Sequence, residues 1–481
     1  MRANVVLRYI GVVMIFLAVS MAASAVVAFV SYRDTSFYAL MLSAILTGLL
    51  GVFPLIFVQK ESELSTKEAY CVVLGAWLLA CVVTMFPYLM WGGEFNVVNA
   101  WFESVSGLTT TGASILTDIE ALPRGLLFWR MMSTWIGGIG VIMFALLILP
   151  SIGSSKMTLS NVELSPMAKD NYHYRTQIIV QIILVVYVGL TAITTLLLKL
   201  AGMNWYDALA HAMSASATSG FGVKNNSIAY YDSVAIESII IFAMIFAGTH
   251  FGLIYATVTG KFNNIFRSEV MRVYIGAIVV CSGLIAMNLY SSGTFETFGE
   301  ALRHGTFQYV SIITTTGFAT VDSNPWPAFS VMLILLASLI CACSGSTTGG
   351  IKINRALLAA KMIRNQIQRQ QHPSAIFRIR IDGVTQDSGV LHGVAIFIIL
   401  YLILLFVGSV VGTIFGLDIM TSFTASASCL GNVGPGFGEV GSMDNYSAIP
   451  QTFKYVLTLL MLLGRLEIFG LIQLFLIKWW R

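Results

Sequence analysis

The chain has 481 residues, of which 57% are hydrophobic and 10% are charged, and its formal net charge is +4. A soluble globular protein carries about 25% charged residues, so this composition excludes that class and indicates an integral membrane protein. The six cysteines include no CxxC pair, and the six histidines have no HExxH or comparable spacing. The sequence therefore gives no support for a zinc site, a redox motif or metal catalysis.

The N-terminal apolar run has two features of a signal peptide. Arg2 and Arg8 precede it, and the small residues at 23–25 could form a cleavage site. The run continues without a break to Val30, however, and more membrane-like sequence follows it. We therefore predict an uncleaved first transmembrane helix.

Ten apolar segments are each long enough for the roughly 20 helical residues that cross a bilayer. Lysine and arginine gather in one set of connections between them, above all at 355–380, and the positive-inside rule puts that set in the cytoplasm. An even number of spans puts both termini on the same side. The predicted spans are residues 9–32, 35–59, 69–93, 131–155, 176–198, 238–260, 273–294, 323–351, 388–417 and 455–477.

Four connections on the opposite side are too long and too apolar for simple loops. Each has a short helix-compatible stretch, then Ser, Thr and Gly, then a polar turn, as expected for a segment that enters the membrane halfway and returns. Aligned on their last glycine they recur about every 100 residues, and such a period defines repeats. The glycines are Gly112, Gly220, Gly317 and Gly434, and six positions before them stand Ser106, Ser214, Ser311 and Ser428.

These repeats predict the fold class and the division of the chain. We expect an all-α membrane protein of ten transmembrane helices, with two N-terminal spans and then four span–pore-helix–span repeats that form a pseudo-tetrameric pore. The predicted boundaries are 1–65 for the two N-terminal helices, 66–155, 156–262 and 263–370 for pore repeats 1 to 3, the third with a broken second helix, and 371–481 for pore repeat 4.

The residue types of the re-entrant segments fit a pore lined by backbone. Glycine lets carbonyl groups turn inward, carbonyl rings can replace an ion's hydration shell, and helix C-termini that point at the centre favour a cation. The motifs contain no Asp or Glu, which calcium sites typically use, so we predict a monovalent ion. Close helix packing by small residues is the simpler alternative. The predicted ion-binding residues are Thr109, Thr110, Thr111, Gly112, Thr218, Ser219, Gly220, Thr315, Thr316, Gly317, Asn432, Val433 and Gly434.

The stretches GLTTTGAS, ATSGFG, TTTGFA and GNVGPGFG resemble the filter sequences of the Trk/Ktr/HKT superfamily of potassium transporters. The resemblance covers essentially the whole chain, including two extra N-terminal spans typical of bacterial Trk membrane subunits. It implies K⁺ uptake across the bacterial inner membrane through a single-chain pseudo-tetramer. It also implies a homodimer and a cytosolic TrkA-type nucleotide-binding gating ring. No cofactor is expected in this chain, and a nucleotide (ATP, ADP or NAD) is expected only on the partner.

By the same resemblance, glycine in all four filters favours K⁺ over Na⁺. The second and fourth motifs depart from the threonine pattern at Ala217, Ser219, Asn432 and Val433, which argues against strict four-fold symmetry. A Na⁺-permeable or Na⁺-coupled transporter on the same scaffold is therefore the alternative. A membrane enzyme would need a nucleophile, a carboxylate pair or a ligand set at one depth, and the sequence offers none.

A run of Ser, Thr and Gly interrupts the eighth span, where helix propensity is poor. A broken helix at membrane depth usually lines a cavity or forms a site, and a flexible kink is the alternative. In the resembled family the matching segment is an intramembrane loop that obstructs the pore. A mid-span arginine is costly, and by resemblance it faces the pore and holds this gate; a structural ion pair is the alternative. The predicted gate residues are Ser344, Gly345, Ser346, Thr347, Thr348, Gly349, Gly350, Lys352 and Arg465.

The basic stretch at 355–380 extends the broken helix toward the cytoplasm. Positive-inside topology with contacts to anionic lipid explains it, and a docking surface for the gating ring is the functional alternative.

Overall fold

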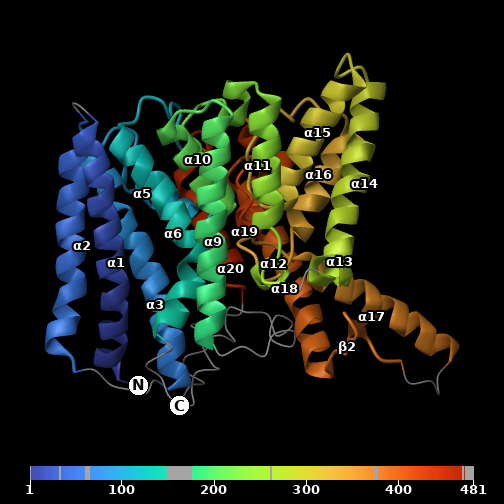
Figure 1. The fold of residues 1–481 in the computed structure, drawn as a ribbon, viewed down its shortest axis with the longest axis horizontal. Helices are drawn as coiled ribbons and strands as arrows, with labels where there is room; N and C mark the ends of the chain where they lie inside the picture. The colour runs from blue at the N-terminus through green and yellow to red at the C-terminus, as the bar shows by residue number, and fades with distance from the viewer. Residues whose placement is uncertain are drawn as a thin grey trace.

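The computed structural model is built almost entirely of helices packed side by side (Figure 1). It describes residues 2–31, 34–59, 65–148, 176–260, 263–372 and 377–468, and Leu471. Within these residues six helical segments are long and apolar enough to cross a membrane, and one bent pair makes a seventh. The six lie in α1 (Ala3–Val30), α2 (Phe37–Phe57), α3 (Thr66–Thr84) continued by α4 (Phe86–Trp91), α9 (Thr176–Leu200), α14 (Glu269–Ser291) and α18 (Ser388–Ile414).

Four shorter helices alternate with the spans and lead into the glycine motifs. Each begins after an Asn, Thr or Asp side chain that accepts a hydrogen bond from the backbone three residues on, which is a stabilising N-cap. In Figure 1 α5, α10 and α15 lie in the upper half of the bundle. The four helices are α5 (Val97–Leu108), α10 (Trp205–Ala217), α15 (Phe298–Ile313) and α19 (Ile419–Gly431).

The predicted sixth span is not one continuous helix. Residues 238–260 fall in α11 (Val234–Ala247) and α12 (Phe251–Val258), which meet at 103° across a three-residue break. Sequence analysis did not predict this break, because Gly248 is the one strong helix breaker among residues 248–250.

The predicted eighth span is broken where the Ser/Thr/Gly run predicted it. Helix α16 (Ala328–Ile340) ends, residues 341–352 are irregular, and α17 (Ile353–Gln371) follows. We refer to residues 344–350, within this irregular stretch, as the polar loop. Helix α17 leaves the lower edge of the bundle (Figure 1).

The basic stretch after the polar loop is fixed against the start of α14. A two-stranded antiparallel hairpin, β1 (Arg380–Ile381) and β2 (Val384–Thr385), follows α17. The Lys361 ammonium lies 2.6 Å from Glu269 and also donates to the carbonyl of Arg380 at 2.6 Å. These contacts hold α17, α14 and the hairpin together.

The remaining elements complete the bundle. The fourth predicted span is α6, and its expected residues 149–155 lie outside the described part of the chain. The tenth begins as α20, whose helix ends at Arg465, and most of its predicted remainder also lies outside the described residues. These elements are α6 (Arg124–Ile148), η2 (Ser227–Tyr231), α13 (Asn263–Arg267), η3 (Gly438–Val440) and α20 (Gln451–Arg465).

The two N-terminal helices pack at close range through glycines. A Cβ added at Gly51 would lie 2.8 Å from the carbonyl oxygen of Gly11 and 2.9 Å from the amide nitrogen of Ile15. Small residues allow membrane helices to approach in this way. At one end of α1, Arg2 pairs with Glu68 at 3.0 Å, and this hydrogen-bonded partner lowers the pKa of the Glu68 carboxyl. This ion pair attaches the start of α1 to α3.

We predict that Gly51→Ala destabilises the protein. The new methyl group meets backbone atoms, which cannot move aside as a side chain can, and overpacking of this kind costs about 1–3 kcal/mol. Gly48→Ala, on the same helix, is the matched control, because its Cβ would meet only the Ala18 methyl at 3.7 Å. Thermal unfolding in detergent should show a lower midpoint for Gly51→Ala alone, and equal midpoints for the two variants would contradict the packing.

Candidate functional site

The four glycine motifs lie next to one another in cyclic order. A Cβ added to any of the four glycines would collide with the carbonyl oxygen of the residue that precedes the next glycine in the cycle. Segments about 100 residues apart in sequence therefore converge on one place, which we call the glycine ring. The contacts run from Gly112 to Ser219, from Gly220 to Thr316, from Gly317 to Val433 and from Gly434 to Thr111.

The backbone repeats one conformation around the glycine ring. Two residues before each glycine, a non-glycine residue has φ of 54° or 55°, and the glycines have φ between 72° and 101°. The amide just before each glycine donates to the carbonyl of the serine six positions before the glycine, at 2.8 to 3.1 Å. This is the bond that closes a Schellman-type helix end. The residues with left-handed φ are Thr110, Thr218, Thr315 and Asn432.

Several of the predicted ion-binding residues have side chains with hydrogen-bond partners inside the protein. The hydroxyls of Thr109 and Thr111 lie 2.8 Å apart, and the Ser219 hydroxyl lies 3.0 Å from that of Ser214. In the fourth segment the side-chain nitrogen Nδ2 of Asn432 donates to the Thr111 hydroxyl at 3.0 Å. These side chains brace the backbone, so the main-chain carbonyls are the better candidate ligands.

The polar loop packs directly against the glycine ring. The hydroxyl of Thr218 donates to that of Thr347 at 3.2 Å, and the Gly349 amide donates to the Thr315 hydroxyl at 3.4 Å. A Cβ added at Gly349 would lie 2.8 Å from the side-chain oxygen of Asn432. Three of the four residues with left-handed φ thus touch the loop.

The stretch that contains the polar loop also interlocks with the break between α11 and α12. The Cys343 amide donates to the carbonyl of Gly248 at 3.1 Å, and the Phe251 amide donates to the carbonyl of Gly345 at 3.2 Å. Irregular backbone at membrane depth needs internal partners for its polar groups. Each break supplies such partners to the other, which explains why both helices break at the same place.

Arg465 connects three parts of the structure. Its guanidinium donates to the carbonyl of Thr347 in the polar loop at 2.6 Å, and to the carbonyls of Gly137 and Gly138 on α6 at 2.8 and 3.2 Å. A cation in a span needs polar partners, and here backbone carbonyls provide them.

Glu467 connects the end of α20 to the start of α17. It lies 3.3 Å from the Lys352 ammonium and also forms an ion pair with Arg355. The Arg355 guanidinium carbon lies 4.0 Å from the centre of the Phe397 ring. Arg465 therefore binds the polar loop directly, at Thr347. Glu467 binds Lys352 and Arg355, which follow the loop.

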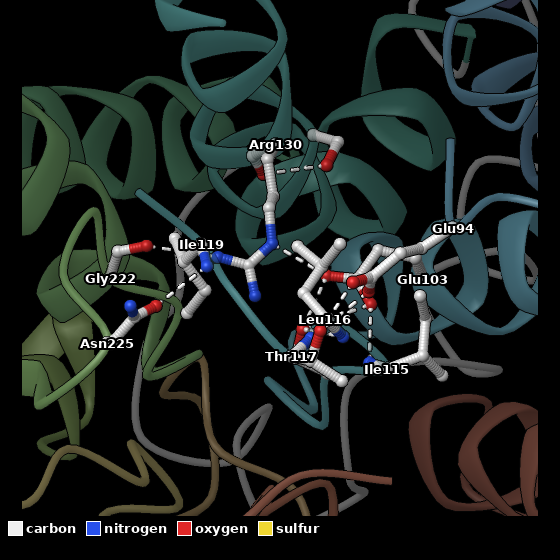
Figure 2. A network of polar contacts seen from close by, with 11 residues as sticks. Glu94, Glu103, Ile115, Leu116, Thr117, Ile119, Arg130, Gly222 and Asn225 are labelled. Carbon is white, nitrogen blue, oxygen red and sulfur yellow. Dashed lines mark hydrogen bonds and ion pairs between the residues drawn. The ribbon is translucent and has the colours of Figure 1, made fainter. Parts of the chain in front are cut away.

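The sequence analysis missed a buried ion pair that contacts the residues following Gly112 and Gly220. Figure 2 shows Arg130 and Glu103 joined directly. The Arg130 guanidinium lies 2.6 Å from the Glu103 carboxylate, and the side chains are 1% and 0% exposed. The available signal was the position of both charges in or beside apolar helical segments, since buried charges need partners.

The connections that follow the first two glycines are tied together by exposed polar contacts. The Lys224 ammonium lies 3.0 Å from Glu120, whose hydrogen bond raises the lysine pKa. The Asn225 side chain donates to Asp118 at 2.9 Å, which lowers the pKa of that carboxyl. The segments that contain Gly112 and Gly220 are thus joined in the connections that follow them as well as at the glycine ring.

The fold and the backbone-lined centre define the class of the protein: a helical, multi-pass membrane protein. The family model TrkH, described as a cation transport protein, matches residues 33–274 and 284–479. The chain belongs to this family and is a membrane ion transporter, not an enzyme.

Individual relatives match over their full length. The Trk system potassium uptake protein TrkH of Escherichia coli K12 is 32% identical over 491 residues, and that of Halomonas elongata is 31% identical over 491 residues, in each case covering 100% of both chains. The crystal structure of the potassium transporter TrkH from Vibrio parahaemolyticus matches with a TM-score of 0.90 and 29% identity, again covering 100% of both chains.

We predict that Gly349→Ala displaces the polar loop, because its Cβ would overlap the carbonyl oxygen of Gly431 and approach Asn432. Backbone amides of the loop should then exchange hydrogen faster, as expected where local opening costs less free energy. Ser344→Ala is the control, because the buried Ser344 hydroxyl makes no hydrogen bond to the part of the chain that the structure describes. Exchange over residues 344–350 measured by mass spectrometry checks this, and equal rates in the two variants would contradict it.

Proposed function

We propose that the chain is the K⁺-translocating membrane subunit of a Trk-type uptake system, and that K⁺ passes through the glycine ring. The cyclic contact between four segments of the same backbone conformation supports this most directly. Carbonyl oxygens from four sides can replace the water around an ion. The names of the relatives, which describe potassium uptake proteins, agree with the ion.

The wider architecture forms part of the same proposal. Two N-terminal helices and four span–pore-helix–span repeats, ten transmembrane helices in all, surround one pore, with boundaries near residues 65, 155, 262 and 370. The protein lies in the bacterial inner membrane with both termini in the cytoplasm. It forms a homodimer and binds a cytosolic TrkA-type ring that carries the nucleotide. The four capped helices that lead into the glycine ring support the repeat assignment.

The polar loop is the proposed gate. Its contacts with Thr218 and Thr315 support this, because a loop packed against the glycine ring would block an ion that passes through the ring. Arg465 and the ion pairs of Glu467 stabilise this closed position. Opening then requires that the bonds of Arg465 and Glu467 break and other partners replace them. A cytosolic partner that pulls on α17 could break these bonds directly.

A Na⁺-permeable or Na⁺-coupled transporter is the second candidate. The observation in its favour is the asymmetry of the ring. Asn432 stands where the other three segments have threonine, and Val433 stands where two of them have it. Asn432 also forms a hydrogen bond to the first segment. Four unequal segments can leave more space around the ion. This would weaken the preference of the glycine ring for K⁺ over Na⁺.

We expect purified protein in liposomes to pass ⁸⁶Rb⁺ in preference to ²²Na⁺, and Gly112→Ser to lose most of this preference. The added side chain collides with the carbonyl of Ser219 and also disfavours the glycine's φ of 78°. Gly276→Ser is the control, because nothing lies within 4 Å of its added Cβ. Equal Rb⁺ and Na⁺ flux in the unmodified protein would favour the second candidate. An unchanged ratio in Gly112→Ser would contradict the pathway.

Arg465→Ala should raise Rb⁺ flux several-fold in the absence of any cytosolic partner. The substitution removes the donors to Thr347 and to α6, so the loop opens more often, and shortening the polar loop should have the same effect. Arg303→Ala, which removes an arginine that pairs with Glu237 away from the loop, is the control. If the folded Arg465→Ala protein conducts like the unmodified one, the gate assignment is wrong.

A further inference from the structure

The ion pair behind the glycine ring has a more specific role than anchoring a helix. We propose that Glu103 and Arg130 are positioning residues that hold the first two segments of the ring in their selective geometry. This inference rests on the proposed function, because it assumes that the ring selects an ion. It concerns residues that do not touch the pathway themselves.

Glu103 holds the chain that leaves the first segment. One of its carboxylate oxygens accepts from Arg130 at 2.6 Å and from the Ser114 hydroxyl at 3.0 Å, and the other accepts from the Ile115 amide at 3.0 Å. Ser114 and Ile115 follow Gly112 by two and three positions. The carboxylate therefore fixes the backbone directly after the glycine.

Arg130 holds the chain that leaves the second segment. Its terminal nitrogen donates to the carbonyl of Gly222 at 3.0 Å, and its guanidinium carbon lies 3.5 Å from the centre of the Phe221 ring, a cation–π contact. Phe221 and Gly222 directly follow Gly220. Figure 2 shows the guanidinium between the carbonyl of Gly222 and the carboxylate of Glu103. One ion pair thus connects the first and second segments of the glycine ring.

The equivalent positions in the other repeats do not carry this charge. Nine residues before the glycine, where repeat 1 has Glu103, the other repeats have His211, Gln308 and Ala425. The His211 ring bonds the carbonyl of Asp207 in its own helix at 2.8 Å. The Glu103–Arg130 ion pair, which we call the brace, therefore supports the first and second segments. The glycine ring is supported unequally around its circumference.

The chemistry of the pair favours a positioning role over a stabilising one. Burying two charges costs about as much desolvation free energy as their attraction returns, so such pairs contribute little net stability. Their hydrogen bonds, however, fix geometry on both sides. Selectivity depends on how carbonyl oxygens surround the ion, and a shift of either braced segment changes that arrangement.

Two substitutions separate geometry from charge. Glu103→Gln is nearly isosteric, but it replaces one acceptor oxygen by an NH₂ group, so either the Arg130 or the Ile115 donor loses its acceptor. Arg130→Lys keeps the charge but loses the planar fork that reaches Glu103 and Gly222 together. If only the charge mattered, Arg130→Lys would behave like the unmodified protein.

The matched control is a second buried carboxylate paired with an arginine. Glu237 on α11 binds Arg303 on α15 through two hydrogen bonds of 2.7 Å, and its side chain is 3% exposed. Neither residue has a hydrogen bond to the ring among the described contacts. Glu237→Gln therefore removes the same chemistry at a distance from the proposed pathway.

The test compares ⁸⁶Rb⁺ and ²²Na⁺ flux through the full-length variants in liposomes. We expect Glu103→Gln and Arg130→Lys to lower the Rb⁺/Na⁺ ratio about tenfold, which corresponds to about 1.4 kcal/mol, and Glu237→Gln to leave it unchanged. Ser114→Ala keeps the ion pair and should lower the ratio only about threefold, because it removes one hydrogen bond to the carboxylate and leaves those from Arg130 and Ile115 in place. It tests the brace even if Glu103→Gln does not fold.

An unchanged ratio in the folded Glu103 and Arg130 variants would overturn the proposal, and so would an equal loss in Glu237→Gln. If the unmodified protein does not discriminate between the ions, the proposed function fails instead. In that case amide hydrogen exchange still tests whether the Glu103–Arg130 pair holds the backbone. The Ile115 amide should exchange faster in Glu103→Gln than in Glu237→Gln, and equal rates would overturn the brace.

Discussion

The structure depends on one steric constraint: four glycines face the carbonyl groups of their neighbours at distances that leave no room for a Cβ. Because each segment packs against the next, no segment can move without the others. In the proposed pathway the same constraint would keep side chains away from the ion and leave main-chain oxygens to replace its water. The left-handed residue two positions before each glycine costs about 1–2 kcal/mol, and the packing of the ring offsets this strain.

The irregular backbone beside the ring follows a second requirement, that polar groups at membrane depth find partners within the protein. The polar loop meets it with bonds to Thr218, to Thr315 and to the break between α11 and α12. Arg465 adds bonds to carbonyls on two elements. Such bonds can be exchanged as a set for others, which is why a polar loop suits a gate better than an apolar plug. The supports are also unequal: an ion pair joins the first two segments, whereas Asn432 joins the fourth to the first.

The sequence predicted the helical membrane fold, the short helices before each glycine and the break at 341–352, because apolar length and runs of Ser, Thr and Gly are local signals. It did not predict the bend at Gly248, which depends on packing against the broken α16. It identified Thr109 and Thr111 as candidate ion-binding residues but did not predict the hydrogen bond between their hydroxyls. It identified Arg465 as anomalous but not its carbonyl partners. It missed the pairing of Glu103 with Arg130, because charges in or beside apolar segments indicate that partners are needed but do not say which residues they are.

The most direct measurement is the position of a heavy alkali ion in crystals of the protein soaked in Rb⁺. Anomalous scattering should give peaks on the axis between Gly112, Gly220, Gly317 and Gly434, within contact distance of the carbonyl oxygens that precede them. Peaks confined to other parts of the molecule, with the ring free of ions, would contradict the assignment of the ring as the ion pathway.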